Sequence, residues 1–68
     1  MNEEQLFQAA DNQSTIKYVP KGTEYRVLGR TKIKRDDGSW VDGIAYAGAD
    51  KVIYDRPLTM FKDFELVD

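Results

Sequence analysis

The residues that could bind a ligand through charge and aromatic rings gather in the middle of the chain. Five of the ten basic residues fall between Arg26 and Arg35, and no acidic residue interrupts that window. Alternate residues of an extended strand lie ~7 Å apart on one face, close to the spacing of phosphates in nucleic acid. Aromatic side chains beside them can stack on unpaired bases. The candidate binding surface consists of Arg26, Arg30, Lys32, Lys34, Trp40 and Tyr46.

Ordinary charge pairing accounts for the same pattern. The cations can pair with Asp42 and other acids and keep the edge of a hairpin soluble. The whole chain carries 12 acidic and 10 basic residues, a net charge of −2, which weakens the case for nucleic acid. Nucleic-acid binding is therefore the second choice for this surface.

Groups suited to catalysis are few. The sequence contains neither histidine nor cysteine, so catalytic triads and histidine or cysteine metal sites are excluded. Ser14 and Ser39 are typical of turns, and the Asp36-Asp37-Gly38 segment lacks the later ligands of a calcium loop. We expect a protein that is not an enzyme, with no metal site and no cofactor.

Amphipathic aromatic residues are numerous for 68 residues. A domain of this size cannot easily bury all of them, and those left outside would form an anchor for a protein partner. They are Tyr18, Tyr25, Trp40, Tyr46 and Tyr54. The expected function is a small non-enzymatic binding module, an adaptor, inhibitor or assembly piece. Its partner is an unknown protein or a second copy of the chain; the alternative is a nucleic-acid-binding barrel that uses the basic and aromatic hairpin.

Length and composition limit the architecture to one small domain. A chain this short buries only ~60% of its unfolded surface, and without cysteine no disulfide can stabilise it. No apolar run is long enough to cross a membrane, and the acidic start of the chain does not resemble a secretory signal. We expect a cytoplasmic protein with no membrane partner.

The first 14 residues predict a short helical arm and a link. Asn2 can cap a helix, with Gln5 at the capping-box position, and Leu6, Phe7 and Ala10 form an apolar stripe. A helix of about eight residues is not stable alone in water. It must dock on the domain, dock on a partner, or fray.

Residues 15–68 predict a mainly β domain. Short apolar runs separated by turn sequences indicate five strands in a small closed or half-closed barrel. The expected strands are 15–19, 24–35, 40–47, 51–54 and 64–67.

The central hairpin has a preferred register. A three-residue loop, Asp36-Asp37-Gly38, pairs Ile33 with Val41 and Lys32 with Asp42, whereas a two-residue loop would place Ile33 opposite Asp42. With strict alternation, one face carries Val27, Gly29, Thr31, Ile33, Val41, Ala45 and Ala47. The other face carries Arg26, Leu28, Arg30, Lys32, Lys34, Trp40, Ile44 and Tyr46.

A strand end and one helical turn at 57–61 are predicted near the end of the chain. Pro57 can begin the turn, which would present Leu58 and Phe61 to the core. The Arg56 guanidinium would tie the strand end to carbonyls or a nearby acid. The expected fold-locking residues are Arg56, Pro57, Leu58, Met60 and Phe61.

The same motif carries a family resemblance. With Tyr18, Lys21-Gly22, the Tyr25-to-Gly29 strand and Tyr46, the Arg56-to-Phe61 hexapeptide resembles a small bacterial and phage family known as domain of unknown function 1653. The resemblance covers Tyr18 to Val67. It implies an SH3-like β-barrel and supplies no activity or ligand.

Overall fold

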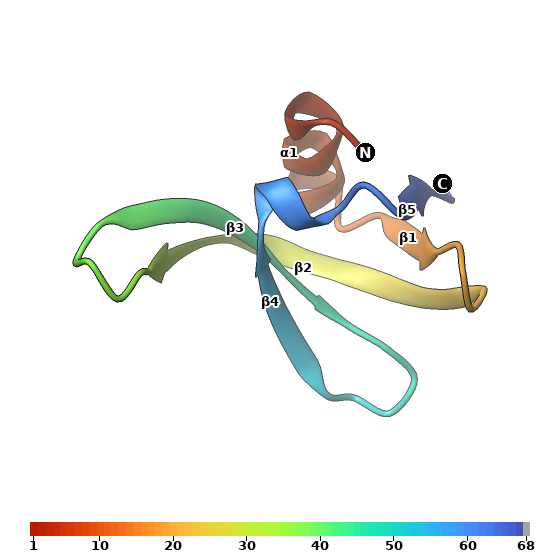
Figure 1. The fold of residues 1–68 in the computed structure, drawn as a ribbon. Coiled ribbons are helices and arrows are strands. Elements are labelled where there is room, and N and C mark those ends of the chain that lie inside the picture. Colours follow the sequence, from red (N-terminus) through yellow and green to blue (C-terminus); the bar gives the residue numbers. More distant parts are fainter. Residues whose placement is uncertain (68) are drawn as a thin grey trace.

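The computed structural model describes residues 1–67, so position 68 of the predicted domain lies outside the described residues. Its elements are α1 (Glu3–Asn12), β1 (Thr15–Tyr18), β2 (Thr23–Lys34), β3 (Trp40–Ala47), β4 (Ile53–Pro57), a 3₁₀ turn η1 (Leu58–Met60) and β5 (Phe64–Leu66). All five strands form one antiparallel sheet in the order β4-β3-β2-β1-β5 (Figure 1). The predicted mainly β architecture with a short helix and a helical turn is confirmed.

The N-terminal helix is docked on the sheet. Asn2 caps it: its side chain accepts a hydrogen bond from the Gln5 amide, and the Gln5 side chain accepts one from the Asn2 amide. The helix ends at Asn12, and the C-cap residue Gln13 adopts a left-handed conformation with φ 51°. Leu6 is fully buried and belongs to the same core as the sheet. Docking thus supplies the stability that ten residues lack alone.

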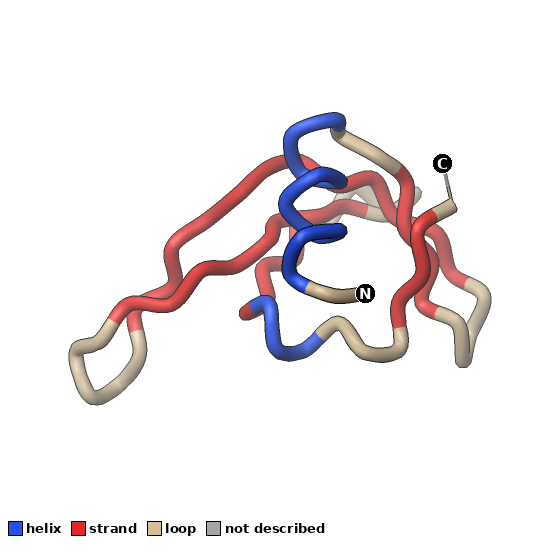
Figure 2. Tube along the Cα trace, turned by 90° about the horizontal axis from the view of Figure 1, so that it is seen from above, coloured by secondary structure: helices blue, strands red, loops and turns tan. Residues whose placement is uncertain are grey.

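The predicted register of the central hairpin is confirmed. Lys32 pairs with Asp42 and Ile33 with Val41, and the Arg35 amide donates to the Ser39 carbonyl across a three-residue loop. Gly38 completes that loop with φ 89°, a conformation that glycine adopts without a Cβ penalty. The distal end of the hairpin projects well beyond α1 (Figures 1 and 2).

The predicted assignment of hairpin residues to the two faces is wrong for the part of β2 that precedes a β-bulge. Pairing shifts between Val27, opposite Tyr46, and Gly29, opposite Ala45, which leaves Leu28 as an extra residue in β2. An extra residue reverses the alternation of all residues before it. Val27 therefore joins Tyr46 in the core, and Arg26 lies on the opposite face.

The fourth strand begins two residues later than predicted and ends at Pro57. Lys51 adopts φ 64° and its amide donates to the Gly48 carbonyl, so the chain is still turning there. The Val52 amide donates to the Asp50 carboxylate, which holds the same turn. β4 consequently starts at Ile53 and continues through Asp55 and Arg56.

The closing motif is only partly a lock. Phe61 is fully buried, Leu58 packs against the core, and Pro57 precedes the 3₁₀ turn in an extended conformation. The prediction for Met60 is wrong, because 53% of its surface is exposed. The expected tie from Arg56 to a carbonyl or an acid is also not formed with any residue of the described chain.

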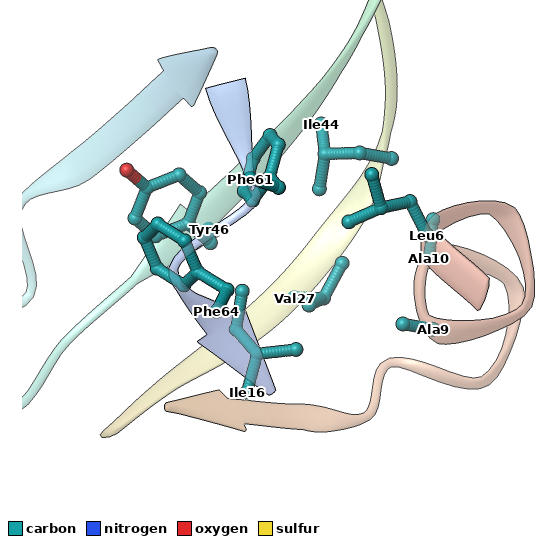
Figure 3. Packing of buried hydrophobic residues seen from close by; sticks show 9 residues of the cluster. All are labelled: Leu6, Ala9, Ala10, Ile16, Val27, Ile44, Tyr46, Phe61 and Phe64. Carbon is teal, nitrogen blue, oxygen red and sulfur yellow. The ribbon is translucent and has the colours of Figure 1, made fainter. Parts of the chain in front are cut away.

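The core lies between α1 and one face of the sheet, called here the core face. Side chains from the helix, from four of the strands and from the segment after η1 point toward one another (Figure 3). The N-terminal ammonium group of Met1 donates to the carbonyls of Phe61 and Phe64 at 3.1 and 3.3 Å, which joins the start of the helix to this segment. The buried apolar residues are Leu6, Ala9, Ala10, Ile16, Val27, Ile44, Tyr46, Phe61 and Phe64.

Two structural features bear on function class. Between residues 1 and 67 no helix is both long and apolar enough to cross a membrane. β4 and β5 are the two ends of the sheet order, and no strand pairing joins them in the described chain. The structure therefore shows one five-stranded sheet, and its closure into a barrel stays a prediction.

Candidate functional site

Three of the six residues of the predicted binding surface are cations that contact other side chains of the protein. Arg30, Lys32 and Lys34 share the core face at the distal end of the hairpin, as predicted. Arg30 donates two hydrogen bonds to the Asp11 carboxylate, at 2.9 and 2.6 Å, and its guanidinium lies 4.3 Å from the centre of the Phe7 ring. These contacts attach α1 to the hairpin.

The two lysines are also partnered. Lys32 forms an ion pair with Asp42, its cross-strand neighbour. The Lys34 ammonium lies 5.9 Å from the centre of the Trp40 ring, and Trp40 keeps 61% of its surface exposed. Arg30, Lys32 and Lys34 are thus engaged within the protein, the first two with acids as the charge-pairing interpretation expects.

The other two predicted residues lie elsewhere. Arg26 is exposed on the face opposite to the core face, because the bulge reverses the alternation before Gly29. Tyr46 is only 2% exposed and packs in the core, so its expected place on an open surface is wrong. The six residues do not form one surface.

A second group of aromatic residues forms a pocket at the other end of the core face. Its volume is about 240 Å³, and we call it the tyrosine pocket. Every strand of the sheet and the β1–β2 turn contribute to it. It is lined by Tyr18, Lys21, Tyr25, Tyr46, Tyr54, Arg56 and Phe64.

The rings of the tyrosine pocket hold one another in place. Tyr46 stacks on Tyr54, its cross-strand partner, with ring centres 5.5 Å apart and planes at 24°. Tyr25 meets both rings edge to face, at 5.1 and 6.0 Å. Tyr18 packs on Phe64 at 5.2 Å. Such contacts fix the positions of large side chains and preorganise the pocket wall.

Among residues 1–67, two cations and no carboxylate line the pocket. Lys21 lies in the β1–β2 turn and Arg56 in β4, and neither forms an ion pair with an acid in residues 1–67. Burial raises the pKa of the Tyr46 hydroxyl, and the Arg56 guanidinium opposes that rise. The Asp50 carboxylate raises the pKa of Tyr54, whose hydroxyl lies 3.5 Å from it. Tyr46 and Tyr54 therefore stay neutral near pH 7.

The side chains of this pocket are chemically complementary to an anionic group with a flat or apolar body. Ring faces offer apolar contact, and a guanidinium offers a planar fork of donors for an oxyanion. No group of three or more potential metal ligands occurs within residues 1–67.

The sequence contained the signal for this pocket only in part. The excess of tyrosines indicated an anchor patch, but strict alternation placed Val27 on the face opposite to Tyr46 and gave no place to Tyr25. The bulge at Leu28 is what brings Tyr25, Tyr46 and Tyr54 to one face.

Comparison with known proteins adds no relative: no family model, no curated protein and no solved structure matches the chain. The resemblance to domain of unknown function 1653 therefore stays a prediction.

Proposed function

We propose that this chain is a non-enzymatic binding module that recognises a protein partner through the tyrosine pocket. The observation that carries the proposal is a preorganised wall of five aromatic rings with two cations, Lys21 and Arg56, that pair with no acid in the described chain. Aromatic and arginine side chains are the residue types that most often dominate binding energy at protein interfaces. The proposal includes an SH3-like barrel of bacterial or phage origin, as the family resemblance implies, and a cytoplasmic location.

The hairpin supports the alternative, nucleic-acid binding, less well. Its lysines and Arg30 already have partners, and binding to phosphates would have to displace Asp11 and Asp42. Release of counterions drives nucleic-acid binding only where cations are free to contact phosphate.

Affinity capture followed by reconstitution tests the proposal. The tagged protein is used to capture partners from extracts of the organism that encodes it, and each captured protein is purified and titrated by calorimetry. Tyr54→Ala is expected to weaken binding at least about tenfold, because truncating an interface aromatic commonly costs more than 1.4 kcal/mol. Tyr54 is 38% exposed, so this variant should remain folded.

Two control variants locate the interface. Arg26→Gln removes a cation from the opposite face and should bind as the wild type does. Loss of binding in Trp40→Ala with normal binding in Tyr54→Ala would move the interface to the hairpin and contradict the proposal. Capture that nuclease abolishes, with no protein partner that binds after purification, would favour the nucleic-acid alternative. Sedimentation of the purified chain alone shows whether the partner is a second copy.

A further inference from the structure

The outer edge of β4 borders the tyrosine pocket. β4 pairs with β3 and occupies one end of the sheet order, so its other side faces no strand of the described chain. Residues Ile53 to Arg56 are all exposed. An exposed edge strand presents a row of unpaired backbone N–H and C=O groups, which an extended peptide can pair with.

The alternation of β4 directs two side chains to the pocket side of the sheet. Tyr54 lies opposite Tyr46 and Arg56 opposite Ile44, and both partners are buried on the core face. A strand that pairs with β4 would place every second side chain on that same face. A residue opposite Arg56 would have its Cβ about 4.5–5.5 Å from the Cβ of Arg56, close enough for a cross-strand pair.

The charge around Arg56 is not balanced within the described chain. A guanidinium has five N–H donors; the Arg56 guanidinium forms a side-chain hydrogen bond with the Tyr46 hydroxyl, and it pairs with no acid in residues 1–67. The two acids nearest in sequence to the pocket residues of β4 form no ion pair with Arg56. Asp55 lies on the opposite face and accepts a hydrogen bond from the Thr31 hydroxyl at 2.7 Å, and Asp50 accepts from the Val52 amide and lies beside the Tyr54 hydroxyl.

We propose that the tyrosine pocket takes an extended acidic peptide, which pairs with the outer edge of β4 and places a carboxylate on Arg56. This inference rests on the proposed function and names its ligand class. Lys21 lines the same pocket and adds a second positive charge, while the tyrosine rings contact the apolar part of the neighbouring peptide residues. A side-chain carboxylate and a C-terminal carboxylate offer the same chemistry to the guanidinium fork.

Nucleic acid fits this end of the molecule less well. Two cations that pair with no acid in residues 1–67 line one pocket of about 240 Å³, which suits a single anionic group with an apolar neighbour. A single strand of nucleic acid requires a basic groove that follows successive phosphates.

Nuclear magnetic resonance titration of the ¹⁵N-labelled chain tests the inference. The probes are four pools of N-acetylated hexapeptides, with glutamate or glutamine fixed at the third position, the other positions randomised, and the C-terminus amidated or free. The amidated glutamate pool should shift the amide signals of Ile53 to Arg56. It should slow hydrogen exchange of those amides that point away from β3, because a new strand pairs with them. The amidated glutamine pool should bind about tenfold more weakly, the loss expected when one charge-assisted hydrogen bond is removed.

Variants assign the charge dependence. Arg56→Gln should abolish the difference between the glutamate and glutamine pools, whereas Arg26→Gln, the same change on the opposite face, should preserve it. A free C-terminus that restores binding of the glutamine pool would identify the C-terminal carboxylate as the source and would support the inference. Equal binding of the two amidated pools with no gain from a free C-terminus, shifts confined to the hairpin, or no shift with any pool would overturn it.

The experiments distinguish a wrong peptide assignment from a wrong proposed function. If a reconstituted protein partner loses binding in Tyr54→Ala while the peptide pools show no carboxylate dependence, the pocket is an interface for another ligand chemistry. If oligothymidylate shifts the signals of Tyr54 and Arg56 and the pools do not, the peptide assignment is wrong.

Discussion

The two ends of the core face use their cations differently. At the distal end of the hairpin, Arg30 and Lys32 each pair with an acid, and Lys34 lies over an aromatic ring. At the tyrosine pocket, Lys21 and Arg56 pair with no acid between residues 1 and 67. Two cations of the basic run that stands out in the sequence, Arg30 and Lys32, are thus neutralised by acids, whereas the two cations of the tyrosine pocket are not.

Cross-strand neighbours explain this difference. The hairpin register places Lys32 opposite Asp42, and the docked helix brings Asp11 to Arg30. Arg56 instead lies opposite Ile44, which is apolar and buried. A cation stabilises the fold when a neighbour neutralises it, and it remains available to a ligand when no neighbour does.

The largest expected effect concerns the core that joins the two ends. Phe61 is fully buried and packs against Phe64 at 5.0 Å and Tyr46 at 5.7 Å between ring centres. Phe61→Ala should lower the free energy of unfolding by ~3–5 kcal/mol, enough to unfold much of so small a domain. Chemical denaturation followed by circular dichroism measures the change.

Met60→Ala is the matched control for this prediction. Met60 is the neighbouring residue and is 53% exposed, so its truncation should change the free energy of unfolding little. Similar losses in the two variants would show that the core and the surface of this segment are misassigned.

A smaller effect is expected at the junction between the hairpin and β4. Gly43 is buried in β3, and a Cβ there would lie 2.9 Å from the Arg56 carbonyl oxygen and 2.6 Å from Ile33 Cδ1. The isoleucine end can move, but the β4 carbonyl cannot without shifting the strand. Gly43→Ala should therefore cost ~1–3 kcal/mol, the usual range for overpacking.

Gly29→Ala is the control for Gly43→Ala. It shows whether replacing a strand glycine is destabilising where the new Cβ meets no other atom. Gly29 lies in β2 with no atom within 4 Å of a Cβ built there. That variant should be neutral or slightly stabilising, since it restricts the unfolded chain. If Gly29→Ala and Gly43→Ala lower the free energy of unfolding equally, the close approach of β4 does not explain the loss in Gly43→Ala. Displacement of β4 in Gly43→Ala should also shift the amide signal of Arg56.

Local sequence signals predicted much of this fold. Three features depend only on residues close in sequence and could be predicted from them: the Asn2 cap, the Asp36-to-Gly38 loop and the 3₁₀ turn. The register followed because one choice paired Lys32 with Asp42 and the other placed an acid opposite Ile33.

The functional site was harder to predict, because it depends on two irregularities. A β-bulge has no fixed sequence signature, and the one at Leu28 reverses the faces of Tyr25, Arg26 and Val27. The left-handed Lys51 delays β4 and aligns Tyr54 with Tyr46. Residues from five strands meet in the pocket only after both shifts are applied.

The smallest expected effect is on the melting temperature, and it compares Arg30, which pairs with Asp11, with Arg56, which pairs with no acid in residues 1–67. The Arg30 guanidinium donates hydrogen bonds to Asp11 and holds the pKa of that carboxyl below its ordinary value of 3.8. A lowered folded-state pKa stabilises the fold above about pH 3.8, and this contribution is lost as the pH falls through the folded-state pKa. Asp11→Asn should therefore melt at a slightly lower temperature than the wild type at pH 7.

Acid and salt then distinguish the two ends. The melting temperatures of the wild type and Asp11→Asn should converge below the folded-state pKa of Asp11, and 1 M NaCl should reduce their difference at pH 7 because exposed charges are screened. Arg56→Gln removes a cation with no carboxylate partner in the described chain, so its melting temperature should not show this pH-dependent loss. A pH-dependent loss in Arg56→Gln equal to that in Asp11→Asn would mean that Arg56 is a structural ion-pair partner, and the contrast between the two ends would fail.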